Sequence, residues 1–146
     1  MKQISELIEG HPLILAQSSD NVRDVARKMS ERNIGAIAVL DAGKLVGIFS
    51  ERDLMTRVVV PGLNPDSTPV SNVMTKAIVA AAPEEEIDSA LQKMQSQGCR
   101  HLPVVDDGRL MGMLSLRDLL KVDDDNHRAR ASFLNELVTY SPDYDS

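Results

Sequence analysis

Two short segments of the sequence place a hydroxyl, a guanidinium and a carboxylate at the same spacing. Ser50 to Asp53 follows one apolar run, and Ser115 to Asp118 follows another. If a helix begins at each serine, its free amides and the serine hydroxyl suit a phosphate group. Arg52 and Arg117 can then pair with phosphate oxygens. Each aspartate, about one helical turn further on, can accept both hydroxyls of a ribose, as the acidic residue of dinucleotide-binding folds does.

The same spacing also has a purely structural interpretation. A serine followed three residues later by an acid is close to a capping box, in which the serine caps the helix and the acid bonds back to the serine amide. From spacing alone, a helix cap and a ligand site explain Asp53 and Asp118 equally well. Arg52 and Arg117 can likewise be solvated surface residues.

Both segments belong to a unit that the chain contains twice. A shift of 65 residues places positions 41–54 on positions 106–119 without a gap, with eight identities in the fourteen positions. The identities include the serine, arginine and aspartate of the two segments. A solenoid needs three or more repeats, so two copies must bury their apolar faces against each other.

Each copy predicts the order strand, helix, strand, strand, helix. Apolar residues recur every three or four positions in each first helix, and a short polar turn with Asp and Gly joins the last two strands. The final helices begin at Ser50 and Ser115. The strands are expected at Leu13–Ala16, Ala36–Leu40 and Leu45–Phe49, and at Ile78–Ala82, Leu102–Val105 and Leu110–Leu114.

Composition excludes several classes of protein. Of the 146 residues, 42% are apolar and 3% aromatic, which indicates a globular chain with an aliphatic core. The net charge is -6 and the basic residues are interleaved with acids, so general nucleic-acid binding is not expected. Cys99 is the only cysteine, which fits a reducing compartment. Without a signal peptide or a membrane-spanning run, the cytoplasm is the expected location.

The repeat resembles the CBS (cystathionine-beta-synthase) domain in its tandem form, over roughly residues 1–122. The resemblance implies an α/β (α+β) fold of two β-α-β-β-α repeats about a pseudo-twofold axis, with two clefts and usually a disc-like dimer. The matching signatures are Leu102–Asp106 with its weaker copy Ala38–Asp41, Gly47–Asp53 with its copy Gly112–Asp118, and Val73-Met74-Thr75.

We expect four regions along the chain. The first repeat covers residues 1–62 and the second covers residues 70–122. A linker with proline, glycine and serine joins them at residues 63–69. Residues 123–146 hold an acidic break, a C-terminal helix and a frayed tail.

The resemblance also implies an adenine pocket in each repeat, between the first strand and the corner where the helix meets the next strand. Because Gly10 stands where the second repeat has Thr75, and Ala38 where it has Pro103, we expect tighter binding in the second repeat. Leu13 and Ile78 can equally be core residues. The matching residues are Thr75, Ile78, Cys99, Arg100, His101 and Pro103 in the second repeat, and Leu13, Ile34, Gly35, Ala36 and Ala38 in the first.

These observations favour a regulatory module that binds AMP, ADP, ATP, NAD or a similar ligand and signals its occupancy through a homodimer or a protein partner. An alternative is a structural dimerisation module with degenerate clefts, which would be expected to lose Asp53 and Asp118. An enzyme acting on a nucleotide is a third possibility. It is disfavoured because Cys99 and His101 lack an orienting third group. Asp123 to Asp125 lacks a calcium-loop pattern, which favours a solvated break over a metal site there. We expect no metal and no cofactor beyond the nucleotide ligand.

Overall fold

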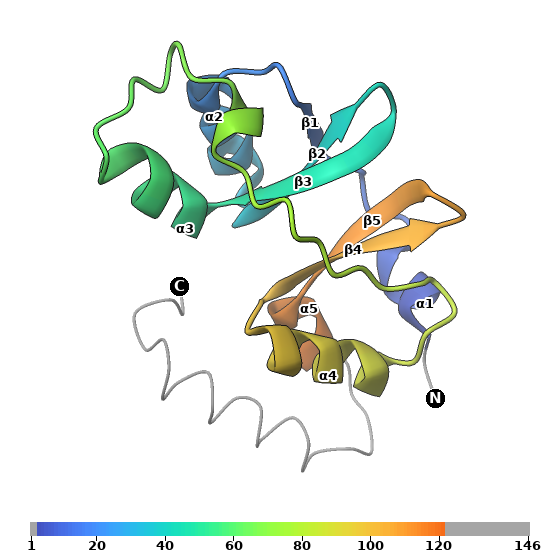
Figure 1. Cartoon of the computed structure of the whole chain (residues 1–146). Helices are drawn as coiled ribbons and strands as arrows, with labels where there is room; N and C mark the ends of the chain where they lie inside the picture. Colours follow the sequence, from blue (N-terminus) through green and yellow to red (C-terminus); the bar gives the residue numbers. More distant parts are fainter. Residues whose placement is uncertain (1–2, 122–146) are drawn as a thin grey trace.

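A computed structural model of the chain describes residues 3–121, shown in Figure 1. The acidic break, the C-terminal helix and the tail that the sequence predicts lie outside the described residues. Within residues 3–121, no helix is long and apolar enough to cross a bilayer.

The first repeat is built around a three-stranded sheet. Strand β1 (Leu15–Gln17) pairs in parallel with β2 (Ala36–Asp41), which pairs antiparallel with β3 (Lys44–Ser50). Helix α2 (Val22–Arg32) begins at an asparagine cap and buries one apolar face on the sheet. After β3, helix α3 (Glu51–Asp53) continues directly into a π-helical turn, η1 (Leu54–Val59).

The second repeat follows the same order with one strand fewer. Helix α4 (Ile87–Gln97) ends at Gly98, whose left-handed backbone (φ 64°) suits glycine. Strands β4 (His101–Asp106) and β5 (Arg109–Ser115) pair antiparallel, and α5 (Leu116–Leu120) follows. The two small sheets and their helices confirm the predicted mixed α/β fold.

The strand predicted at residues 78–82 does not form. Ala81 makes a single parallel bridge to Val104, with its amide 2.9 Å from the Pro103 carbonyl oxygen and its own carbonyl oxygen 2.9 Å from the Val105 amide. Pro103 has no amide hydrogen and cannot extend this ladder as Ala38 does in β2. Pro103 therefore removes the pair on one side of the bridge. Pro83 removes the pair on the other side, because its equivalent in the first repeat, Ser18, donates its amide to the Leu40 carbonyl oxygen at 2.8 Å.

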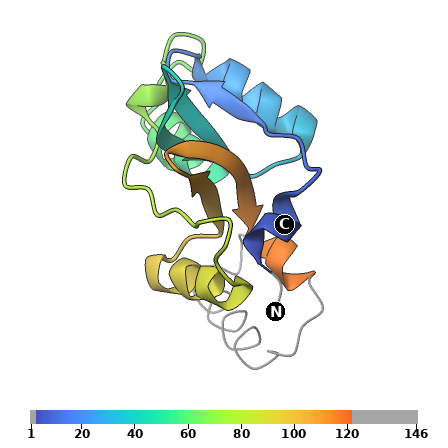
Figure 2. The same cartoon turned by 90° about the vertical axis from the view of Figure 1, so that its right-hand side faces the viewer.

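The leading segment of each repeat packs on the other repeat. Helix α1 (Ile4–Ile8), which the sequence analysis did not predict, lies against the second repeat in both views (Figure 1, Figure 2). Its Ile4 is fully buried in the second core, and the Ile4 and Ser5 amides donate to the Glu85 and Pro83 carbonyls at 3.0 and 2.8 Å. The leading segment of the second repeat packs in the same way on the first. Its 3-10 turn η2 (Val70–Asn72) and Met74 contribute buried side chains to the core of the first repeat.

Two glycines at equivalent positions in the repeats permit this exchange. A Cβ atom on Gly112 would lie 3.1 Å from the Ile8 side chain, and a Cβ atom on Gly47 would overlap the Met74 side chain. Each glycine therefore lies on the middle of a strand that the other repeat's leading segment crosses. Because the exchange brings each leading segment beside the opposite repeat, it determines which residues share a cleft.

Candidate functional site

Both serine-to-aspartate segments form capping boxes. The Ser50 hydroxyl oxygen accepts from the Asp53 amide at 3.1 Å, and the Ser50 amide donates to Asp53 Oδ2 at 3.1 Å. The equivalent distances between Ser115 and Asp118 are 3.1 and 3.3 Å. The structural interpretation of the spacing is thus confirmed. It leaves room for a ligand, because a carboxylate has about four lone-pair positions and the amide bond occupies one.

Two clefts lie between the repeats, and each contains one of these aspartates. The cleft with Asp53 has a volume of about 320 Å³, and the cleft with Asp118 has a volume of about 830 Å³. Both volumes fall in the range that small-molecule sites occupy, roughly 300–1,000 Å³. We call them the Asp53 cleft and the Asp118 cleft.

The predicted pocket residues divide between the clefts in an unexpected way. Gly35, Ala36, Arg100 and His101 line both clefts. The predicted residues of the Asp53 cleft are Ser50, Arg52, Asp53, Thr75, Ile78 and Cys99. Those of the Asp118 cleft are Leu13, Ile34, Ala38, Ser115, Arg117 and Asp118.

The prediction that each cleft belongs to one repeat is therefore wrong. Thr75 opens the second repeat but lies beside Asp53 of the first, because the leading segments exchange. Leu13 of the first repeat lines the cleft of Asp118 in the second. The expectation of tighter binding in the second repeat rested on placing both Thr75 and Pro103 with Asp118, and the structure places Thr75 with Asp53 instead.

Pro103 lines neither cleft. It is buried within β4, where its carbonyl oxygen accepts the Ala81 amide. Its equivalent Ala38 does line the Asp118 cleft. The structure thus places Pro103 in the backbone ladder of the second repeat and outside the linings of both clefts.

Asp53 is the most enclosed acid of the two clefts. Only 7% of its surface is exposed. The Thr75 hydroxyl donates to its Oδ1 and Oδ2 at 3.1 and 3.2 Å. The guanidinium of Arg57 lies 3.7 Å from Oδ1. The carboxylate is thus held by groups from its own helix and from the segment that leads into the second repeat.

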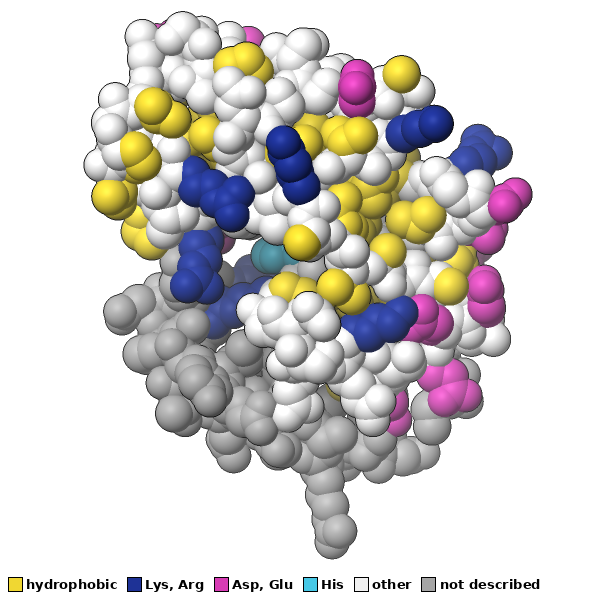
Figure 3. All heavy atoms as spheres, viewed as in Figure 1, with side chains coloured by type: hydrophobic (Ala, Val, Ile, Leu, Met, Phe, Trp, Pro, Cys, Tyr) yellow, Lys and Arg dark blue, Asp and Glu magenta, His cyan; other side chains and the backbone are white. Residues whose placement is uncertain are grey.

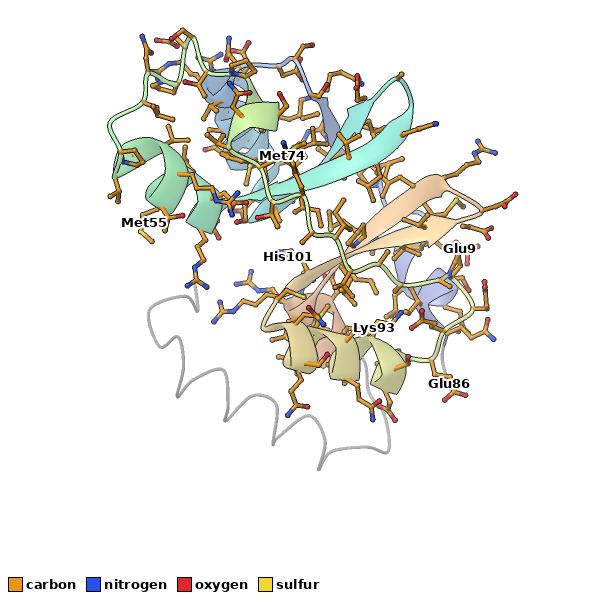
Figure 4. The ribbon with its side chains drawn as sticks, in the orientation of Figure 1. Glu9, Met55, Met74, Glu86, Lys93 and His101 are labelled. Carbon is orange, nitrogen blue, oxygen red and sulfur yellow. The ribbon has the colours of Figure 1, made fainter. Side chains whose placement is uncertain are left out.

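His101 lies in the wall between the two clefts and is labelled between the repeats in Figure 4. Burial, with a smaller contribution from the charge of Arg100, lowers the pKa of His101 to about 4, although the charge of Asp118 opposes the shift. The imidazole is therefore neutral at neutral pH. In Figure 3 a histidine side chain lines a hollow between the two halves, with Lys and Arg side chains near its edge.

Cys99 lines the Asp53 cleft as a half-buried thiol. Burial raises the pKa of this thiol, despite hydrogen bonds that lower it. The thiol therefore remains protonated at neutral pH, which suits a lining residue better than a nucleophile.

Sequence reasoning missed three charged residues at or near the clefts. Glu51 lines both clefts, Lys121 lines the Asp118 cleft, and Arg57 contacts Asp53. For two of them, the spacing from the predicted aspartates carried a signal. Lys121 follows Asp118 by three residues and Arg57 follows Asp53 by four, so each returns to the same helix face one turn later.

The CBS domain family's sequence profile matches this chain twice, at residues 4–60 and 70–125. The chain is a tandem pair of CBS domains. The resemblance found in the sequence is thus confirmed. Tandem CBS proteins of this type are generally regulatory rather than catalytic.

Relatives with the same domain pair occur in plants, bacteria and archaea. The chain is 32% identical to the Arabidopsis thaliana "CBS domain-containing protein CBSX3, mitochondrial" over 83% of this chain and 61% of that protein. It is 32% identical to CBS domain-containing protein YhcV of Bacillus subtilis, over 80% of this chain and 83% of that protein. The chain thus spans about three-fifths of the Arabidopsis protein.

Solved structures share the arrangement. A CBS-domain containing protein from Agrobacterium tumefaciens superposes with a TM-score of 0.75 and 31% identity, over 82% of this chain and 98% of that one. A CBS domain protein from Pyrobaculum aerophilum, solved in complex with AMP, superposes with a TM-score of 0.73 and 26% identity. That match covers 94% of this chain and 99% of the Pyrobaculum chain.

Proposed function

We propose that this CBS pair binds an adenine nucleotide of the AMP, ADP, ATP or NAD class in its two clefts and signals the occupancy to a partner. The observation that carries the proposal is the repeated composition of the clefts. In each, a capped Ser-x-Arg-Asp segment of one repeat faces apolar and small residues from the leading segment of the other. The AMP complex of the Pyrobaculum protein supports the choice of ligand class.

The clefts offer the groups that such a ligand requires. Asp53 and Asp118 are the acceptors for ribose hydroxyls. Cationic side chains provide charge for phosphates, although the chain as a whole carries -6. They are Arg52 and Arg100 in the Asp53 cleft, and Arg100, Arg117 and Lys121 in the Asp118 cleft.

A structural module with degenerate clefts is the competing function. Two observations favour nucleotide binding over it: both clefts have volumes typical of ligand sites, and both retain the acidic residue beside the helix start. Catalysis has less support. Across residues 3–121, no three His, Cys, Asp or Glu side chains gather into a metal-binding group, and the Cys99 thiol is held protonated. Unchanged nucleotide after incubation with the protein is the expected result of product analysis.

The proposed route of the signal is a homodimer. Apolar side chains are exposed on and just after the last helical segment of the first repeat, where Met55 points outward in Figure 4. Val59 and Val60 are 66% and 75% exposed, and Leu63 follows them. Exposed apolar groups of this kind are typical of an interface.

A thermal-shift screen with AMP, ADP, ATP and NAD tests the proposal. A ligand at about 100 times its dissociation constant stabilises the folded protein by about 2.7 kcal/mol, so the melting temperature should rise with at least one of the four. GTP serves as the control for nonspecific phosphate binding. No shift with any of the four at millimolar concentration would contradict nucleotide sensing.

A further inference from the structure

Arg57 joins the Asp53 carboxylate to the segment that enters the second repeat. Its Nε lies 3.7 Å from Asp53 Oδ1, and its Nη1 donates to the Met74 carbonyl oxygen at 2.8 Å. The neighbouring Thr75 donates its hydroxyl to the same carboxylate and pairs its backbone with Ile48 of β3 at 2.8 and 2.9 Å. Two groups fixed by different parts of the chain thus hold one carboxylate.

The Asp118 carboxylate has a different environment. The residue equivalent to Thr75 is Gly10, which has no hydroxyl. Among the hydrogen bonds within residues 3–121, Asp118 accepts one at its carboxylate, from the Ser115 amide at 3.3 Å. We call the contacts of Thr75 and Arg57 with Asp53 the brace; within residues 3–121, the Asp118 carboxylate has no equivalent of it.

We propose that Arg57 is a positioning residue that, with Thr75, holds the Asp53 carboxylate in the orientation that accepts ribose hydroxyls. This proposal rests on the proposed nucleotide binding and extends it. It makes the Asp53 cleft selective for ribose over 2′-deoxyribose, and more selective than the Asp118 cleft.

The carboxylate keeps enough acceptor capacity for this role. Of its roughly four lone-pair positions, the Ser50 amide occupies one and the single Thr75 proton is shared between the two oxygens. The Arg57 contact is long and leaves positions open. Since Asp53 is already fixed, a ribose bound there loses little free energy to ordering the acceptor.

The test measures ribose selectivity in the Asp53 cleft. Calorimetric titrations are performed with AMP and 2′-deoxy-AMP on Asp118→Asn protein, in which the other cleft lacks its charged acceptor. The readout is the ratio of the two affinities. If Arg57 and Thr75 only stabilised the fold, removing either would change both affinities together and leave this ratio unchanged.

Four variants in that background define the expected result. Arg57→Met should reduce the affinity ratio about two- to fivefold, as the loss of a partly exposed ion pair implies. Thr75→Val should reduce it by at least as much, and Thr75→Ser, which retains the hydroxyl, should restore it. Arg23→Met removes an exposed arginine paired with Asp66, away from both clefts, and should leave the ratio unchanged.

Three outcomes would overturn the proposal while leaving nucleotide binding intact. The first is an unchanged or increased ratio in Arg57→Met and Thr75→Val, because it would mean that the brace competes with ribose or does not affect it. The second is loss of AMP binding in Asp118→Asn when the wild type binds. The third applies if Arg57→Met does not fold and Arg57→Lys takes its place. It is an unchanged ratio in both Thr75→Val and Arg57→Lys. If the wild type binds no adenine nucleotide, the proposed function itself fails.

Discussion

Asp53 and Asp118 have the same neighbours in sequence and different neighbours in space. Each completes a capping box with the serine three residues before it. Asp53 additionally receives the Thr75 hydroxyl, which the sequence analysis placed with Asp118. Spacing within one helical turn therefore predicted the local bonds of both acids, but it could not predict a contact made by a segment 22 residues away.

His101 should make the stability of the protein depend on pH. Its pKa is about 4 in the folded protein, because of burial first and the charge of Arg100 second, and 6.5 in the unfolded chain. The unfolded chain thus binds the proton more readily. Titration of His101 therefore costs no stability above about pH 6.5, and it lowers the free energy of unfolding progressively as pH falls toward about 4. Between about pH 7 and pH 5 the free energy of unfolding should fall by roughly 2 kcal/mol from this group.

Urea denaturation of the wild type and His101→Gln at these two pH values measures the effect. Glutamine has a similar size and does not titrate, so the variant should show a smaller fall in unfolding free energy than the wild type. The same pH dependence in both proteins would show that His101 is not the group responsible.

At the scale of elements, equivalent lysines support the two repeats differently. Lys28 Nζ donates to the Leu15 carbonyl oxygen at 2.8 Å, and Lys93 Nζ donates to the Ala80 carbonyl oxygen at 2.9 Å. Lys93 also pairs with Glu85 at 2.6 Å. Burial raises the pKa of Glu85. Hydrogen bonds from Lys93, the Ala82 amide and Ser89 together lower it by more, so the pKa of Glu85 lies below its usual value.

Removing Lys93 should therefore cost more stability than removing Lys28. The segment that Lys93 holds has one strand bridge, whereas Lys28 holds a strand that is already paired. We expect Lys93→Met to lower the free energy of unfolding by about 1–2 kcal/mol, and Lys28→Met by less than about 1 kcal/mol. Denaturant melts of both variants decide the point. Equal losses would contradict a special role for Lys93 in the second repeat.

The sequence predicted the elements that have a clear period or turn. The helices α2 and α4 and the hairpins β2–β3 and β4–β5 were predicted correctly to within a few residues. Helix α1 was missed because its apolar residues Ile4, Leu7 and Ile8 span little more than one turn, too short for a periodic signal. The extra strand was predicted because apolar residues at 78–82 suggested it, and the missing donor of Pro103 was not considered.

At the scale of the whole molecule, the exchange of leading segments determines which residues line each cleft. The 65-residue offset aligned the repeats correctly but carried no information about which repeat each leading segment would cover. Most of the candidate residues therefore line one of the two clefts, but their grouping by repeat was wrong. Gly47 and Gly112 were a detectable signal of the exchange, since a glycine in the middle of a strand often marks a close approach by another part of the chain.

The proposed dimer is tested by changing its exposed apolar surface. Light scattering should give twice the 16.0 kDa mass of one chain for the wild type. Val60→Asp places a charge in the proposed interface and should shift the mass toward 16.0 kDa at micromolar concentration. Met111→Asp, a matched change at an exposed apolar residue of β5, should remain dimeric. A wild type that is monomeric at all concentrations tested would refute the dimer.

The central claim is that both clefts bind an adenine nucleotide through their aspartates, and calorimetric titration of AMP into wild type and Asp53→Asn/Asp118→Asn tests it most directly. Asparagine preserves the size of each side chain but removes the charged acceptor. Loss of a hydrogen bond to a charged group, about 1.5–3 kcal/mol, should weaken binding about 10- to 150-fold. Melting curves of both proteins separate this effect from a weakened helix cap. Equal AMP affinity in the two proteins, even with a lower melting temperature in the variant, would contradict the account and leave the aspartates as helix caps.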